Sequence, residues 1–198
     1  MRTDDDPAQL HRVVADGFRA VADATPAGGW DAPAPVAGWA ARDVVRHLVE
    51  WFPPFLAGGA GVRLPAGPPV DADPAAAWRA QAESVQALLD DPTTADRVLV
   101  NPHLGEVPLP EAVARFYVAD VFMHTWDLAR AVGLGGPTAG LDPTYAAQLL
   151  AGMEPIEEVL RTSAQYGARV PAPADADPVT ALMAFVGRDP AFGTPDRG

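Results

Sequence analysis

The stretch PEAVARFYVADVFMHTWDLARAV, residues 110–132, predicts the longest helix of the chain. Pro110 suits a first helical turn, and the residues after it keep an apolar stripe at helical spacing. Asp120 and His124 are four positions apart and Asp127 follows three positions later, so in a helix their side chains project from one face. A line of polar groups therefore runs along a stripe that is otherwise apolar.

This polar line has two interpretations. An ionised carboxylate is expensive to bury without compensation, and a bound cation is one form of compensation. An Asp–His pair on a partly solvated helix face is the other. The spacing of Asp120 and His124 alone does not decide between them.

A second predicted helix supplies another histidine. The segment GWAARDVVRHLVEW, residues 38–51, predicts a helix that starts near Trp39 or Ala40 and is ended by Pro53. Val44, Leu48 and Trp51 mark its core-facing stripe, and His47 lies at the edge of that stripe. A histidine there is either a hydrogen-bonded core residue or a ligand.

Taken together, His47, Asp120 and His124 form a set of two imidazoles and one carboxylate. Zn²⁺ accepts such a set and keeps a fourth position for water or substrate, which is the catalytic rather than the structural arrangement. Fe²⁺, Ni²⁺ and Mn²⁺ suit the same donors. We therefore predict a divalent metal site, and the donors leave zinc, nickel, iron and manganese open as its metal.

The rest of the chain predicts a mainly helical, all-α fold. Four Asp-Pro pairs each precede an Ala-rich periodic stretch, where Asp would cap the helix and Pro would occupy its first position. A Gly/Pro-rich loop is expected after Pro53, and a short β-hairpin around residues 101–105. We predict one domain over residues 1–198, an antiparallel helix bundle with extra C-terminal helices. The expected helices cover residues 7–24, 39–52, 74–89, 110–132, 143–161 and 178–187.

The composition excludes several classes of protein. The chain has 198 residues, 14 Lys and Arg against 26 Asp and Glu, and a net charge of −12, which disfavours nucleic acid and anionic membranes as partners. It contains no Cys, so thiolate metal sites and cysteine nucleophiles are excluded. An acidic N-terminus without an apolar segment and the absence of a long apolar run predict a cytoplasmic protein.

The other histidines have simpler interpretations. His11 is expected on a solvated face of the first helix, and His103 in the turn of the hairpin. Neither is expected to take part in the site.

Several neighbours of the metal set keep two interpretations each. Asp127 either orients a metal-bound histidine or pairs with Arg130 or a neighbouring helix. Trp51 and Trp126 are core or pocket-wall residues. Glu50 is either a solvated helix-end carboxylate or a general base or fourth ligand.

Three segments together resemble a known superfamily. GWAARDVVRHLVEW and DVFMHTWDLARAVG are similar to the ligand-bearing helices of the DinB-like, or mycothiol-dependent maleylpyruvate isomerase-like, superfamily of metal-binding helix bundles. The distal VPAPADADPVTALMAFVGRDPAF resembles the end of an actinobacterial subfamily described as metal-binding proteins. In that distal segment, Arg188-Asp189-Pro190 is expected to be a helix-ending structural motif.

The resemblance implies a DinB-like four-helix bundle whose divalent metal, typically zinc, is held by His47, Asp120 and His124. Where the isomerases carry Glu, this chain has Asp120, which is one methylene shorter. The resemblance also implies a low-molecular-weight thiol such as mycothiol, whose pKa the metal would lower.

Two functions follow as hypotheses. The first is a metal-dependent enzyme, a transferase or isomerase, that uses mycothiol or metal-bound water on a small organic substrate. The second is a non-catalytic bundle that binds or sequesters a small molecule and keeps a vestigial or structural metal site. A homodimer through an exposed helix face is compatible with both.

Overall fold

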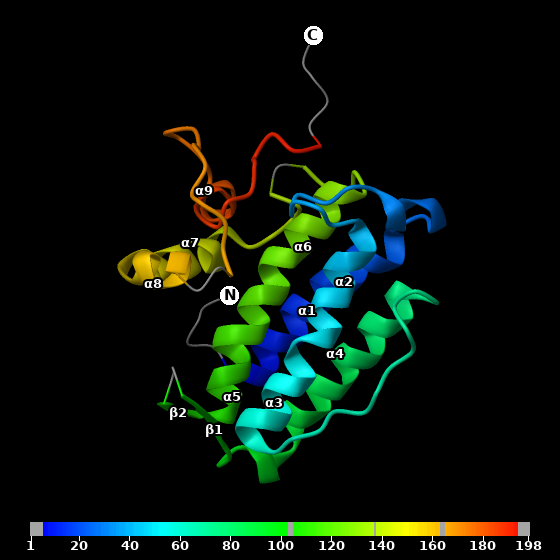
Figure 1. Ribbon diagram of the computed structural model, residues 1–198, viewed down its shortest axis with the longest axis vertical. Helices are drawn as coiled ribbons and strands as arrows, with labels where there is room; N and C mark the ends of the chain where they lie inside the picture. The colour runs from blue at the N-terminus through cyan, green and yellow to red at the C-terminus, as the bar shows by residue number, and fades with distance from the viewer. Residues whose placement is uncertain (1–5, 103–104, 137, 163–164, 194–198) are drawn as a thin grey trace.

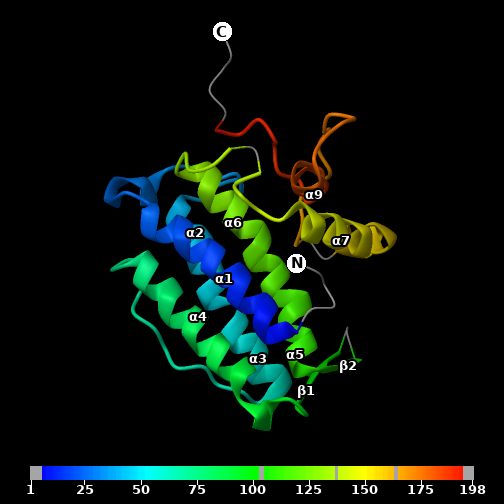
Figure 2. The same cartoon turned by 180° about the vertical axis from the view of Figure 1, so that it is seen from behind.

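Four helical rods form a bundle in the computed structural model, which describes residues 6–102, 105–136, 138–162 and 165–193. Helices α1 and α2 each pack against both α4 and α6, so α1 and α2 lie diagonally opposite each other (Figures 1 and 2). This confirms the prediction of a mainly helical, DinB-like bundle. The prediction that the helices are antiparallel throughout is wrong, because the connection over residues 61–73 returns along the bundle and α4 then runs parallel to α2, with Arg46 of α2 contacting Asp71 just before α4. The rods are α1 (Pro7–Ala24), α2 (Ala41–Glu50) continued by α3 (Phe52–Ala60), α4 (Pro74–Asp90), and a long helix made of α5 (Leu109–Ala112), a π-helical segment η3 (Val113–Val118) and α6 (Ala119–Ala131).

The distal helices gather beside α6 rather than extending the bundle (Figure 1). Tyr145 packs edge-on against Phe122 of α6, with ring centroids 5.0 Å apart. Within the described ranges, no helix combines the length and apolar character needed to span a membrane. The distal elements are α7 (Pro143–Met153), the 3₁₀ turn η4 (Glu154–Ile156), α8 (Glu157–Thr162) and α9 (Pro178–Phe185).

The predicted hairpin is present between α4 and α5. Strands β1 (Val98–Asn101) and β2 (Gly105–Pro108) pair antiparallel, and the buried Leu99 faces α3. A Cβ on Gly59 would lie 2.9 Å from Cγ of Leu99, so only glycine permits this close approach of α3 to the hairpin. His103 lies outside the described residues. Two further 3₁₀ turns, η1 (Ala27–Asp31) and η2 (Pro92–Thr94), connect the rods.

The predicted aspartate caps are confirmed at three of the four helix starts. The carboxylates of Asp73, Asp142 and Asp177 accept hydrogen bonds from backbone N–H groups in the first turns of α4, α7 and α9. Asp6 was predicted to act in the same way, but its side chain makes no capping hydrogen bond. Its backbone carbonyl accepts from the Leu10 N–H instead.

Two boundaries set by proline were predicted wrongly. Pro53 and Pro54 do not begin a loop, because they occupy the first turn of α3, where their missing N–H groups are not needed. The predicted helix over residues 143–161 is divided, since Pro155 lies in η4 between α7 and α8. Both errors arise because proline interrupts a helix interior but is accepted in a first turn.

The long helix over residues 109–131 contains the π-helical segment, which ends two residues before Asp120. A π segment is an α-helix with an extra residue, and such segments are frequent at functional sites. In η3, Tyr117 is fully buried and stacks on Phe52 with ring centroids 3.9 Å apart. This stack joins the start of α3 to the helix that bears Asp120.

His11 was predicted on a solvated face, and this is wrong. It is 1% exposed, its Nδ1 lies 2.8 Å from Oε1 of Gln86 in α4, and its ring stacks near Tyr117. Burial lowers the pKa of His11, against smaller opposing effects of the Gln86 hydrogen bond and of Asp90. The neutral imidazole is therefore the form that the α1–α4 contact stabilises.

This burial predicts a pH dependence of stability. Because the pKa of His11 is lower in the folded chain, the unfolded chain binds more protons below about pH 6.5, and the free energy of unfolding should fall as the pH drops. One such group contributes at most about 1.4 kcal/mol per pH unit. His11→Asn keeps a donor near the Nδ1 position but does not titrate, so its stability should fall less steeply. Urea titrations of both proteins between pH 7.5 and 5.5 measure the difference, and parallel curves would contradict the prediction.

Candidate metal centre

Three ligand-type side chains meet where α2 packs against α6. His47 comes from α2, and Asp120 and His124 come from consecutive turns of α6. Their side chains are 31%, 18% and 5% exposed, so the cluster is buried at His124 and reaches the surface at His47. The structure thus brings together the three residues that were predicted as a set.

The spacing of the donor atoms suits a divalent ion. Nε2 of His47 lies 3.0 Å from Oδ2 of Asp120, and Nε2 of His124 lies 3.4 Å from Oδ1. Ligands about 2.1 Å from a tetrahedral ion are themselves roughly 3.4 Å apart. One ligand atom from each residue falls within a common 4.8 Å, and no fourth ligand-type side chain in the described part of the chain joins this group.

The charges of the cluster favour a cation. Burial would raise the pKa of Asp120, but the two imidazoles and a hydrogen bond from Trp51 outweigh it and hold that pKa below its usual value. Burial would lower the pKa of His124, but the Asp120 and Asp127 carboxylates raise it instead. Asp120 therefore stays ionised at neutral pH and attracts either a proton on an imidazole or a metal ion.

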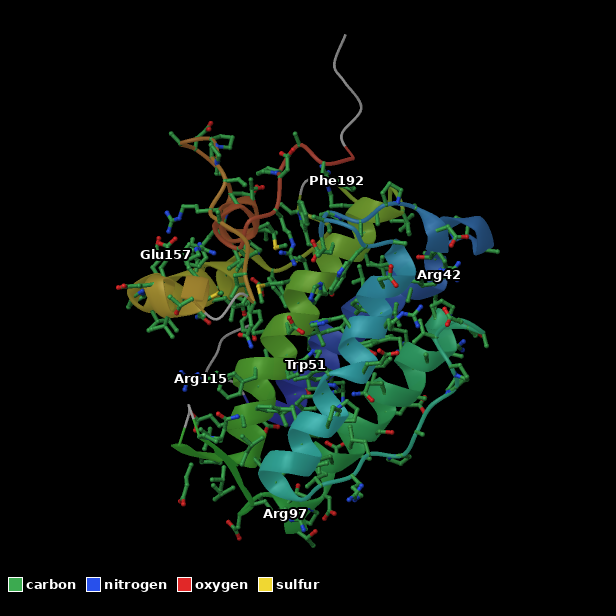
Figure 3. The ribbon with its side chains drawn as sticks, viewed as in Figure 1. Arg42, Trp51, Arg97, Arg115, Glu157 and Phe192 are labelled. Carbon is green, nitrogen blue, oxygen red and sulfur yellow. The ribbon has the colours of Figure 1, made fainter. Side chains whose placement is uncertain are left out.

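Two tryptophans border the cluster. Nε1 of Trp51 donates a hydrogen bond of 2.9 Å to Oδ2 of Asp120, so this residue is a wall of the site rather than core alone. Figure 3 shows Trp51 between the ribbon of α6 and those of α2 and α3. The ring of Trp39 lies 5.2 Å from His47 and 5.7 Å from His124, between ring centroids. Sequence reasoning placed Trp39 only as a helix start and missed this role.

Asp127 contacts both a histidine of the cluster and an arginine, so each of its two predicted roles is met in part. Oδ2 of Asp127 lies 2.9 Å from Nδ1 of His124, which leaves Nε2 of that ring facing Asp120. The basic partner of Asp127 is Arg188, not Arg130, which donates to the carbonyls of Pro190 and Phe192. Arg188-Asp189-Pro190 was predicted as a helix-ending structural motif, and the contact between Arg188 and Asp127 was not predicted.

The remaining candidates lie outside the cluster. Glu50 is 63% exposed and lies 3.9 Å from Arg46, which fits a solvated helix-end carboxylate. Trp126 is buried, and the Arg130 guanidinium lies 5.3 Å from its ring centroid, so it belongs to the core.

A further residue near the site comes from the segment after α8. Burial, together with the negative charge of Asp120, raises the pKa of Tyr166 to about 12. The Tyr166 phenol is therefore protonated at neutral pH and offers a hydrogen-bond donor. No local sequence signal identified it.

Comparison with known proteins places this geometry in a family. Residues 10–129, which include all three residues of the cluster, match the model of the mycothiol maleylpyruvate isomerase N-terminal domain. Two relatives from Mycobacterium tuberculosis, one from strain CDC 1551 / Oshkosh and one from strain ATCC 25618 / H37Rv, are each 28% identical over 186 residues. Each match covers 92% of this chain and 98% of the relative, and both relatives are called uncharacterized proteins. No solved structure matches the chain significantly.

The mycobacterial relatives agree with the resemblance to an actinobacterial subfamily, and the family match spans both helices that carry the cluster. The chain belongs to the family of the mycothiol maleylpyruvate isomerase N-terminal domain, within the DinB-like superfamily.

Proposed function

We propose that this chain is a divalent-metal-dependent enzyme that acts on a small organic substrate. Its metal would activate a low-molecular-weight thiol, mycothiol by preference, as the nucleophile. Metal-bound water is the alternative nucleophile. The observation that supports this most is the convergence of His47, Asp120 and His124 without a fourth protein ligand in the described residues. Three protein ligands and an open position are typical of catalytic zinc sites, whereas structural sites have four. The family match supports the thiol, because mycothiol is part of the family's name.

The ligands have distinct tasks in this proposal. Asp120 would supply the negative charge, while His47 and His124 would donate through their Nε2 atoms. A divalent ion, zinc by preference, would act as a Lewis acid that lowers the pKa of a thiol or water at its fourth position. Trp51 holds Oδ2 of Asp120 by its hydrogen bond, which fixes the direction of the carboxylate.

The surroundings suit an organic reactant. Trp39 covers one side of both imidazoles and presents an apolar face that keeps water from that side. The exposed edge of His47 gives a reactant access from solvent.

Metal content tests the site first. Protein purified without added metal or a His tag should contain about one zinc, nickel or iron per chain, as measured by elemental analysis. His47→Ala should remove it. Asp120→Asn keeps the shape but loses the charge, and its affinity in a competition titration should drop by more than the roughly 10–100-fold that loss of an outer contact costs.

Glu50→Gln is the matched control, because it neutralises a carboxylate near the cluster that is exposed and takes no part in it. It should bind metal like the wild type. Equal affinity of the Asp120→Asn variant and the wild type would show that Asp120 is not a ligand.

Turnover tests the enzymatic part. Zinc-loaded protein mixed with mycothiol and small electrophiles, maleylpyruvate among them, should give product only when metal is present; product that also requires the thiol supports mycothiol as the nucleophile, and product without thiol supports metal-bound water. Asp120→Asn should lose at least about 100-fold in rate, as expected when a Lewis acid that contributes several kcal/mol is lost, while Glu50→Gln retains activity. Full metal loading without turnover of any electrophile would instead favour a non-catalytic bundle that binds a small molecule.

A further inference from the structure

Arg188, a residue outside the matched domain, contacts Asp127 beside the candidate metal site. Arg188 follows α9, whereas the family match ends at residue 129. Its Nε lies 3.1 Å and 3.2 Å from the two Asp127 oxygens, and its Nη2 lies 3.0 Å from Oδ2. Asp127 is 0% exposed and the Arg188 side chain 13%, so the pair is almost entirely shielded from water.

Arg188 is held in place by the end of α9. The Arg188 N–H donates to the Met183 carbonyl and the Gly187 N–H to the Ala184 carbonyl, in the pattern of a Schellman helix end. Gly187 has φ +89, and a Cβ there would lie 2.8 Å from Cα of Gly167. These contacts fix the backbone from which the Arg188 side chain extends. The segment after α9 runs toward the C-terminal half of α6 (Figure 1).

Asp127 links Arg188 to the cluster. The same oxygen, Oδ2, faces Nη2 of Arg188 at 3.0 Å and Nδ1 of His124 at 2.9 Å. Nδ1 of His124 is thus the ring nitrogen next to the Asp127 carboxylate, and Nε2, which faces Asp120, is the ring nitrogen placed to donate to a metal. The guanidinium also compensates the charge of Asp127, so the charge of Asp120 remains for a cation.

We propose that Arg188 is a positioning residue for the metal site and that it acts through Asp127 on His124. The contact between Arg188 and Asp127 and metal binding are then thermodynamically linked: formation of this contact raises metal affinity, and metal binding strengthens the contact by the same factor. This inference depends on the metal site proposed above. It adds a residue that lies outside the family domain.

A second arginine provides the control. Arg130 also joins α6 to the distal segment, through the carbonyls of Pro190 and Phe192, but it does not contact Asp127 (Figure 3 labels Phe192). Arg130→Ala and Arg188→Ala therefore each remove one link between α6 and the distal segment. Arg188→Ala alone removes the partner of Asp127.

The test is a zinc competition titration with the full-length chain. Arg188→Ala should bind zinc more weakly than the wild type, by up to about 10-fold, because it acts one contact further from the metal than the ligand partners whose loss costs roughly 10–100-fold. Arg188→Lys should recover part of this loss, because lysine keeps the positive charge but cannot form the paired hydrogen bonds of a guanidinium with a carboxylate. Arg130→Ala should stay within about 2-fold of the wild type. Circular dichroism of each metal-free variant checks that it folds.

The double variant shows whether Arg188 acts through Asp127. If it does, Asp127→Asn combined with Arg188→Ala should bind zinc no more weakly than Asp127→Asn alone, within about 2-fold. Hydrogen exchange provides the reciprocal measurement. Zinc should slow exchange of the amides in residues 178–192 in the wild type, and this protection should be absent in Arg188→Ala.

Three results would overturn the proposal. Unchanged zinc affinity in Arg188→Ala would show that Asp127 needs no guanidinium. An equal loss in Arg130→Ala would assign the effect to general loosening of the segment. A wild type that binds no divalent ion would refute the metal site itself, and with it the proposed function.

Discussion

Two ionised carboxylates lie on one side of α6, and each has to be compensated by groups from other parts of the chain. Burying an unpaired carboxylate costs several kcal/mol, so the helices around α6 are constrained to bring partners to it. The end of α2 brings His47 and Trp51 to Asp120, and the end of α9 brings Arg188 to Asp127. His124 lies between the two carboxylates and contacts both.

Local chemistry predicted most of the fold. The start and end of α1 and the start of α4 agree with prediction, because Asp-Pro pairs and apolar spacing act within a few residues. The errors at Pro53 and Pro155 have one cause: a proline that ends one helix also suits the first turn of the next. His11 was misplaced because α4, 75 positions away, supplies the partner that buries it.

The candidate site was predictable in part for the same reason. Asp120 and His124 are neighbours on one helix, so their spacing indicated a common site, and only one further histidine had to be chosen. Arg188 is 61 positions from Asp127, and an arginine next to a helix-ending glycine has no local pattern that names its partner. Trp39 and Tyr166 were missed because their positions follow from packing between distant elements.

The π-helical segment over residues 113–118 has a consequence for the two halves of the long helix. Each residue turns an α-helix by about 100°, so one additional residue sets the rotation of α6 independently of the rotation of α5. The first half can meet the hairpin with one face while the second half presents Asp120 and His124 to α2. A homologue that lost a single residue in this segment could not keep both contacts, because α6 would be rotated relative to α5. The site therefore requires the length of this segment more than the identity of its side chains.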